Sequence, residues 1–422
     1  MMRRIFSCVV LVMMAGLALL SAGCGGQAER STRITVVGWN TMADTFREQA
    51  KAFERQHPDI KVDVQTVDSD YTRIMPRLSA GTDLPDVMVF QNRDFPTFLN
   101  QKADAFLDVT SDFKGSKDHF VPASWDAVTK DGKIYGVPTD MGPAALFYRA
   151  DLFEKAGIDA DKIETWDDLI EAGKKLSAAT NGETAMLGTA EDTDFFDQLL
   201  NQAGGHYTSQ DDKTIVLNSA EGKKATMLMQ RMVQEGTLKN VQSWDGRLLA
   251  MKRDQIAAVP YGVWFAGTIS SELPEQKGKW KVIPLPAMDK GGARAANSGG
   301  SVAVVASNSR HKEAAVAFLK FCEDTEEGET IALKHGLFPA YTPIYSSAEF
   351  QKENAYFGTA IYPLFAQIAA EIQPLHRGPV SLESGKATKE LIQHVLSGAN
   401  VDQALAEAAQ AIAQATGLKA EK

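Results

Sequence analysis

The sequence predicts an α/β protein that folds into two lobes. Short apolar runs alternate with amphipathic stretches from residue 34 onward, as strands and helices do in an α/β fold. The 422 residues exceed what one hydrophobic core usually supports. Because no Pro- or Gly-rich linker divides the chain, we expect the two lobes to be joined by several crossing strands.

The first predicted unit is β-α-β. Residues 34–38 form an apolar run, and residues 42–56 carry apolar side chains at helical spacing. His57-Pro58-Asp59 ends this helix, and residues 61–64 alternate as the next strand.

Later segments continue the alternation. A helix is predicted over residues 71–79, before an apolar strand over residues 86–90 of the kind found in sheets covered on both faces. Thr165 is the predicted N-cap of another helix, with Asp168 in the capping-box position. Ligands bind at the ends of strands in sheets of this kind, such as the strand over residues 86–90. Further predicted elements are strands over residues 144–148 and 301–306 and helices over residues 311–323 and 402–416, the last needing a partner surface.

The N-terminus predicts export. Arg3 and Arg4 precede a charge-free apolar run that ends near Leu20. This is the pattern of a secretory signal, and the run is too short for a comfortable membrane span.

A cysteine follows the apolar run. Ser21-Ala22-Gly23-Cys24 resembles a bacterial lipobox, although Ser21 stands where an aliphatic residue is usual. The resemblance implies a lipoprotein signal peptide over residues 1–23, diacylation of Cys24, and a polar tether over residues 24–33. The alternative is a signal peptide with a chance cysteine near its end.

Charge and cysteine content limit the partners. Removing Arg3 and Arg4 from the 44 basic residues leaves 42 against 54 acidic ones, a balance that argues against nucleic acid as a partner. Cys322 is the one thiol left after Cys8 and Cys24, so no disulfide can form within the mature chain. Its apolar neighbours predict a buried, unreactive side chain.

Reactive motifs are absent from the sequence. The seven histidines are scattered, and there is no His-Glu-x-x-His motif, nucleophile elbow or phosphate-binding glycine loop. These observations predict no metal, no cofactor and no enzymatic activity.

Several motifs resemble one family. The segments 132–149 (GKIYGVPTDMGPAALFYR), 151–157 (DLFEKAG) and 165–169 (TWDDL) resemble the extracellular sugar-binding proteins of ABC importers, relatives of maltose-binding protein. Shorter pieces of the same pattern follow in order at 52–54, 57–58, 84–87, 261–264, 299–300 and 312–319, so the likeness covers nearly all of the mature chain.

The resemblance implies a two-lobed periplasmic-binding-protein-like fold, with mixed sheets flanked by helices and a hinged cleft. It implies an N-lobe over residues 34–141 plus 285–342 and a C-lobe over residues 142–284 plus 343–422. It further implies a monomeric carbohydrate-binding lipoprotein, anchored to the outer face of the cell membrane by its lipid alone, that delivers solute to the permease subunits.

A sugar site needs an aromatic plate and side chains with two or more hydrogen-bonding atoms. Trp264 matches the aromatic plate of the family and is the first candidate, with Trp244 and Tyr261 as secondary ones. Trp39 and Asn40 follow the first predicted strand. The alternatives are that Trp264 packs in the core and that Trp39 packs at the hinge.

Polar candidates follow other strands. Asp140 lies just after the crossing toward the second lobe and would accept hydrogen bonds from sugar hydroxyls, or else cap the turn that follows. The remaining candidates form three groups: Gln91, Asn92 and Arg93; Glu191 and Asp194; and Asn297, Ser298 and Gly299. The first group would otherwise form a solvated turn, and the second would otherwise cap a helix. The third belongs to a glycine-rich stretch that permits close approach of a ligand.

The chain departs from the family in two places. Ser301 follows the two glycines where many relatives have Trp, and no second aromatic plate is identifiable between residues 381 and 389. Maltose specificity is therefore not transferred, and the ligand is expected to be smaller or more polar. A polyamine is an alternative ligand, since acidic and Trp side chains suit cations. A surface glycosidase using Asp140 and Asp194 is a weaker one.

Overall fold

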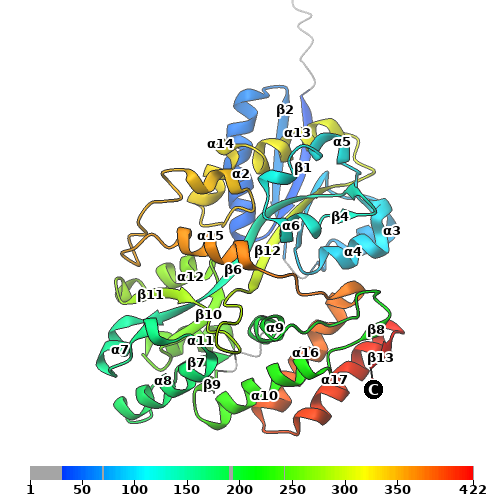
Figure 1. Ribbon diagram of the computed structural model, residues 1–422. Coiled ribbons are helices and arrows are strands. Elements are labelled where there is room, and N and C mark those ends of the chain that lie inside the picture. Colours follow the sequence, from blue (N-terminus) through cyan, green and yellow to red (C-terminus); the bar gives the residue numbers. More distant parts are fainter. Residues whose placement is uncertain (1–30, 69–70, 190–192, 242, 422) are drawn as a thin grey trace, which may run out of the picture.

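The computed structural model describes residues 31–68, 71–189, 193–241 and 243–421. The predicted signal peptide, Cys24 and Glu191 lie outside the described residues. Figure 1 shows two lobes, each with strands covered by helices, and β6 running from one into the other.

The first lobe is built on a mixed sheet. Strand β1 (Thr32–Gly38) pairs in parallel with β2 (Ile60–Thr66) and β3 (Val87–Gln91). Strand β12 (Asn297–Val305) pairs antiparallel with β3 and with β6 (Val137–Arg149). Strand β3 is buried over most of its length, as its apolar sequence predicts.

Helices cover this sheet. The apolar side of α2 (Asn40–Gln56) packs on α13 (Lys312–Glu323), with ring centroids of Phe53 and Phe318 5.4 Å apart. Residues 129–130 (β4) and 133–134 (β5) form a small antiparallel pair. The other helices of the lobe are α3 (Met75–Ala80), α4 (Phe95–Lys102), α5 (Thr110–Phe113), α6 (Pro122–Asp126) and α14 (Glu326–Lys334).

The second lobe uses the other half of β6. Strands β10 (Ala258–Gly262) and β11 (Trp280–Pro284) flank it antiparallel. Two parallel pairs lie elsewhere in the lobe: β7 (Leu187–Thr189) with β9 (Leu238–Asn240), and β8 (Thr214–Ile215) with β13 (Lys419–Ala420). The surrounding helices are α7 (Ala150–Lys155), α8 (Trp166–Ala179), α9 (Thr193–Gln202), α10 (Ala220–Gln234), α11 (Trp244–Lys252), α12 (Phe265–Glu272), α16 (Ser381–Leu396) and α17 (Val401–Thr416).

The lobes meet where β6 and β12 cross. The register of their pairing shifts near Gly142, where a Cβ atom would overlap the carbonyl group of Ser298. A glycine is therefore needed for the two backbones to approach. Helix α15 (Tyr362–Glu371) packs on β6 at this junction, with the rings of Phe365 and Phe147 5.8 Å apart.

Most predicted elements are confirmed, with one shifted start. The capping box of α8 is present: Thr165 Oγ1 accepts from the Asp168 amide at 3.2 Å, and Asp168 Oδ2 accepts from the Thr165 amide at 2.8 Å. Cys322 is buried, and α17 packs on α16. The helix predicted from residue 71 instead begins at Met75, because Tyr71 takes a φ of 61° and its side chain is buried. No helix within the described ranges has the length and apolar character of a membrane span.

Candidate functional site

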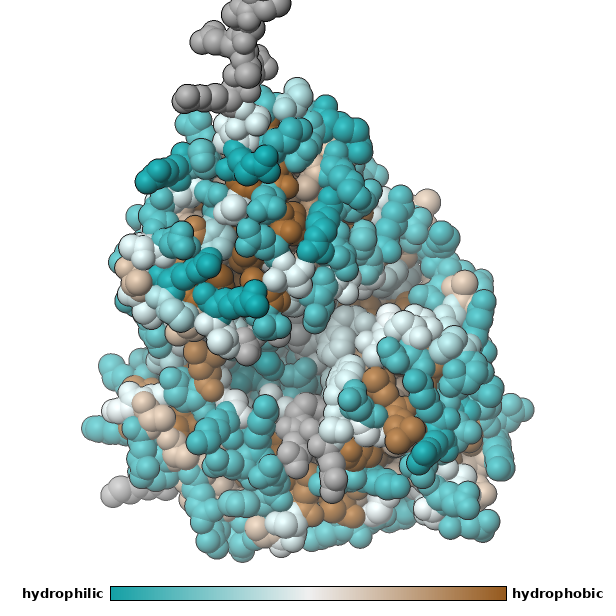
Figure 2. All heavy atoms as spheres, turned by 180° about the vertical axis from the view of Figure 1, so that it is seen from behind, coloured by the Kyte–Doolittle hydropathy of each residue, from teal (hydrophilic) through white to brown (hydrophobic). Residues whose placement is uncertain are grey.

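A hollow lies between the two lobes. It has a volume of about 310 Å³, and Figure 2 shows the surface drawn inward there. Both lobes and the segment after α15 contribute to its walls. The polar side chains that line it are Asn92, Arg93, Asn100, Ser124, Asp126, Asp194, Asp197, Asn201, Asp212, Asn297, Ser298, Gln373, His376 and Arg377.

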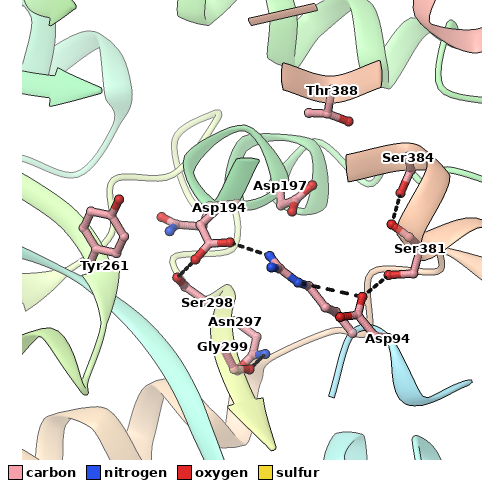
Figure 3. Close-up of polar contacts among 12 residues, drawn as sticks. Asp94, Asp194, Asp197, Tyr261, Asn297, Ser298, Gly299, Ser381, Ser384 and Thr388 are labelled. Atoms are coloured by element: carbon pink, nitrogen blue, oxygen red, sulfur yellow. Dashed lines mark hydrogen bonds and ion pairs between the residues drawn. The ribbon is translucent and has the colours of Figure 1, made fainter. Parts of the chain in front are cut away.

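An ion pair spans this cleft. Arg93, two residues beyond β3, reaches from the first lobe, and its Nη1 lies 2.8 Å from Oδ1 of Asp194. Asp194 sits in the first turn of α9, where the positive end of the helix dipole favours a carboxylate. The Ser298 hydroxyl donates to the other oxygen of Asp194 at 3.0 Å, and Figure 3 shows the two side chains directed at each other.

A second, more deeply buried pair lies one helical turn on. Asp197 accepts hydrogen bonds from the Arg377 guanidinium and from the Tyr207 hydroxyl, the latter at 2.7 Å. The guanidinium also lies 4.6 Å from the ring centroid of Tyr207. Burial lowers the pKa of Arg377, but the charge of Asp197 more than offsets this, so the pKa is above its ordinary value. The Arg377 guanidinium therefore stays charged at neutral pH despite its burial.

Asp94 ties the first lobe to α16. Its Oδ1 accepts from the Ser381 hydroxyl at 2.6 Å, as Figure 3 shows, and its Oδ2 accepts from the Tyr71 hydroxyl at 2.9 Å. The Thr97 hydroxyl donates to the carbonyl of Gly378 at 3.1 Å. The hydrogen bonds to Ser381 and Gly378 hold the segment between β3 and α4, which includes Arg93, at the rim of the cleft.

One histidine, His376, lines the same cavity and contacts a second, His206. His376 Nε2 lies 2.9 Å from Oδ1 of Asp212, and the His376 backbone amide donates to His206 Nδ1 at 3.2 Å. Burial and the neighbouring His376 lower the pKa of His206, which favours the neutral ring that accepts this bond. In the part of the chain that the structure describes, no three His, Cys, Asp or Glu side chains are arranged to bind a metal.

An aromatic cluster lies beside the cavity. The rings of Trp244 and Trp264 stack with centroids 6.2 Å apart, and Tyr261 meets Trp264 edge-on at 5.5 Å. Trp264 Nε1 donates to the carbonyl of Ser298 at 2.7 Å, which connects the cluster to the cavity wall. Trp244 is 40% exposed, so a ligand can reach its ring.

Comparison with known proteins identifies the family. A match to the family described as bacterial extracellular solute-binding protein spans residues 39–329. The chain belongs to this family.

Individual relatives cover nearly the whole chain. The arabinooligosaccharide-binding protein of Bacillus subtilis (strain 168) is 29% identical over 397 residues, which cover 89% of this chain and 90% of that protein. The lactose-binding protein of Rhizobium radiobacter is 28% identical over 388 residues, 88% of this chain and 90% of that protein. The solved ABC transporter associated binding protein from B. animalis subsp. lactis Bl-04, in complex with beta-1,6-galactobiose, is 27% identical. It superposes with a TM-score of 0.75, covering 93% of this chain and all of the other.

These findings confirm the resemblance seen in the sequence and the two-lobed periplasmic-binding-protein-like fold. Since the family is extracellular, this solute-binding protein is exported. The named relatives are binding proteins.

The fold brings part of the predicted site together. The predicted residues that line the cavity of this solute-binding protein are Asn92, Arg93, Asp194, Asn297, Ser298 and Gly299. Trp244, Tyr261 and Trp264 form the adjacent aromatic cluster rather than the wall.

Three candidates of the first lobe lie outside the cavity lining. Trp39 is the N-cap residue of α2 and meets Tyr71 edge-on at 6.3 Å. Asn40 is exposed with a φ of 41°, and the backbone of Gln91 pairs with β12. The cavity lining includes none of these three residues.

Asp140 is buried at the crossing of β6 and β12. Burial raises the pKa of its side chain to about 7, even though hydrogen bonds from Ser301 lower it. Its Oδ1 has no hydrogen-bond partner, and only its backbone carbonyl contacts the site, by accepting from Asn92 at 3.2 Å. The glycosidase alternative needs Asp140 and Asp194 on either side of one bond, whereas only Asp194 lines the cavity.

Sequence reasoning missed other residues of the wall. Asp197 and Asn201 share a face of α9 with Asp194, and this helical spacing was the available signal. His376 and Arg377 lie in an irregular segment before α16 that carries no motif.

Proposed function

We propose that this solute-binding protein captures a carbohydrate, a mono- or oligosaccharide, in the cleft and delivers it to the permease of an ABC importer. The observation that carries the proposal is the convergence of carboxylate, amide and guanidinium side chains from both lobes on one cavity of about 310 Å³. Each of these groups has two or more hydrogen-bonding atoms, which suits the paired hydroxyls of a sugar. The names of the arabinooligosaccharide- and lactose-binding relatives support the same ligand class.

Apolar groups complement the polar ones. Met141, Ala123 and Ala127 line the cavity, and the rings of Trp264 and Trp244 lie beside it. A sugar would place its C–H face against such surfaces while its hydroxyls bind the polar wall. We propose as ligand-binding residues the predicted ones that line the cavity or form the aromatic cluster beside it, extended by Asp197, Asn201 and Arg377.

Capture would involve closure of the lobes, and contacts available only when both lobes touch the ligand would shift the population toward the closed form. We place the lobe boundaries as the sequence predicts, with residues 34–141 plus 285–342 in one lobe and residues 142–284 plus 343–422 in the other. The crossing of β6 and β12 at Gly142 supports a hinge there.

We further propose that the exported chain is a monomer held at the outer face of the membrane by lipid on Cys24. The lipobox-like Ser21-Ala22-Gly23-Cys24 supports this, and residues 24–33 would serve as the tether. Metabolic labelling with a radioactive fatty acid tests the anchor: label in the parent and none in Cys24→Ala is expected, and equal label in both contradicts it.

A thermal-shift screen tests the ligand class. Purified protein would be heated with neutral mono- and oligosaccharides, polyamines and amino acids. A ligand that binds the folded state raises the melting temperature with its concentration. A rise with one or more sugars is expected, and a rise with a polyamine or amino acid but with no sugar would overturn the proposal.

A further inference from the structure

We propose that the cleft selects uncharged sugars and rejects sugars that carry a carboxylate or a phosphate, because both arginines of its wall are already paired with aspartates. The inference rests on the proposed carbohydrate function and narrows its ligand class.

The first arginine is occupied from across the cleft. The guanidinium of Arg93 is bound to Asp194 at 2.8 Å and lies 4.0 Å from Oδ1 of Asp94. A sugar carboxylate that approaches the remaining N–H groups of Arg93 would lie beside the Asp194 carboxylate. Repulsion between the two carboxylates would then offset much of the attraction to the guanidinium.

The second arginine is occupied more tightly. Arg377 and Asp197 are 9% and 6% exposed, and the Tyr207 ring covers the guanidinium. Such a buried pair resists opening, since separating its members leaves a charge without a partner in a poorly solvated place. His376, the remaining basic group at the wall, is directed at Asp212.

The charge at the wall is negative overall. Among the described residues that line the cavity, four are aspartates and two are arginines. An anionic ligand therefore meets a net repulsion, and the excess of acidic over basic residues in the whole chain adds to it at long range. A neutral sugar avoids this repulsion and still binds through the lone pairs and N–H groups that the ion pairs leave available.

The test compares three ligands of nearly the same shape by calorimetry. They are β-1,6-galactobiose, the disaccharide in which its terminal CH₂OH group is oxidised to a carboxylate, and the methyl ester of that acid. We expect the acid to bind at least about ten-fold more weakly than the neutral disaccharide at low salt, and the ester to recover most of the loss. The ester separates the effect of charge from that of the added oxygen.

The variant Asp194→Asn tests the cause. It removes one carboxylate and leaves Arg93 available to an anion, so the ratio of acid to neutral affinity should rise at least about ten-fold. Asp402→Asn is the matched control, because Asp402 is also ion-paired, to Lys223 at 2.6 Å, but lies on α17 outside the cavity lining. The ratio of acid to neutral affinity in Asp402→Asn should equal that of the parent protein. The ratio is read within each variant, so a general loss of affinity does not mimic the effect.

The outcomes separate the two proposals. Equal binding of acid and neutral disaccharide overturns charge selection but leaves carbohydrate capture intact. An unchanged ratio in Asp194→Asn, with the parent selective, overturns the assignment to the Arg93–Asp194 pair. If none of the three ligands binds, the neutral sugar that emerges from the thermal-shift screen is compared with its own acid and ester. If no sugar binds at all, the carbohydrate function fails and the inference with it.

Discussion

The cleft and the interior of the first lobe both contain carboxylates that are largely shielded from water, but the partners of these carboxylates differ. Asp194 and Asp197 each bind an arginine. Asp140, Glu323 and Glu329 are buried inside the first lobe, and in the described structure none of the three takes part in an ion pair.

The difference shows in the protonation of these groups. Burial, and then the like charge of its neighbours, raises the pKa of Glu329 well above its ordinary value, and both of its carboxylate oxygens lack a hydrogen-bond partner. Burial and the neighbouring Asp140 likewise raise the pKa of Glu323 well above its ordinary value. Burial therefore favours the protonated form of Glu323 and Glu329, whereas each of the two cleft carboxylates has an arginine partner. Four predictions test this contrast.

The largest effect is expected from breaking the buried pair of the cleft. Asp197→Ala leaves the Arg377 guanidinium buried without its carboxylate and should lower the free energy of unfolding by about 3–5 kcal/mol in urea titrations. Asp402→Ala breaks the exposed pair with Lys223 and should cost less than about 1 kcal/mol. Equal losses in the two variants would show that the cleft pair is no different from a surface pair.

The next effect depends on pH. The folded-state pKa of Asp140 is about 7, above its unfolded value, so the folded chain keeps a proton that the unfolded chain releases. The contribution of Asp140 to the free energy of unfolding should therefore fall as the pH rises from about 4 to about 7 and stay constant above that. Asp140→Asn removes this loss. The free energy of unfolding of the variant, relative to that of the parent, should therefore rise across that pH window by at most roughly 4 kcal/mol.

The control for this prediction is Asp118→Asn, the same substitution at an exposed position. Other charged or titratable groups lie around Asp140, Glu323 and Glu329, and they are the same in all three proteins. They are Asp324 with its partner His119, Cys322, Tyr341 and Tyr345. A gain in Asp140→Asn that does not vary with pH would contradict the assigned protonation.

A smaller effect concerns ligand affinity. Trp264→Ala should weaken binding of the sugar found in the thermal-shift screen by about 1–3 kcal/mol, measured by calorimetry, because it removes a ring next to the cavity and the stack with Trp244. Trp264→Phe keeps a plate but not the hydrogen bond to Ser298, and should lose less. Unchanged affinity in Trp264→Ala would remove the aromatic cluster from the site.

The smallest effect is expected from the half-exposed pair of the cleft. Arg93→Gln removes an ion pair whose side chains are 39% and 21% exposed, so its effect on unfolding should be below about 1 kcal/mol and should shrink further at high salt. A loss as large as that of Asp197→Ala would mean that Arg93 supports the fold rather than the ligand.

The alternation of apolar runs and helical spacing predicted most of the fold, since strands such as β3 are uniformly buried. The start of α3 was not predictable, because the φ of Tyr71 depends on contacts of its ring and hydroxyl with distant Phe90, Phe98 and Asp94.

The site was predictable where polar residues follow strands, as Asn92 and Arg93 do, or sit at the glycine-rich crossing. Arg377 was missed because the segment around it has neither periodicity nor motif, and its role follows from a pairing with Asp197, 180 residues away. The stacking of Trp244 on Trp264 likewise joins the starts of two helices, α11 and α12, that the sequence cannot place together.

Calorimetric titration of one neutral oligosaccharide into the parent protein and into Asn201→Trp tests the central claim most directly. Asn201 lines the cavity from α9, and an indole there would fill much of its roughly 310 Å³. The account predicts one saturable site in the parent and none in a variant whose melting temperature without sugar is close to that of the parent. Equal affinity in the two proteins would show that the sugar binds elsewhere.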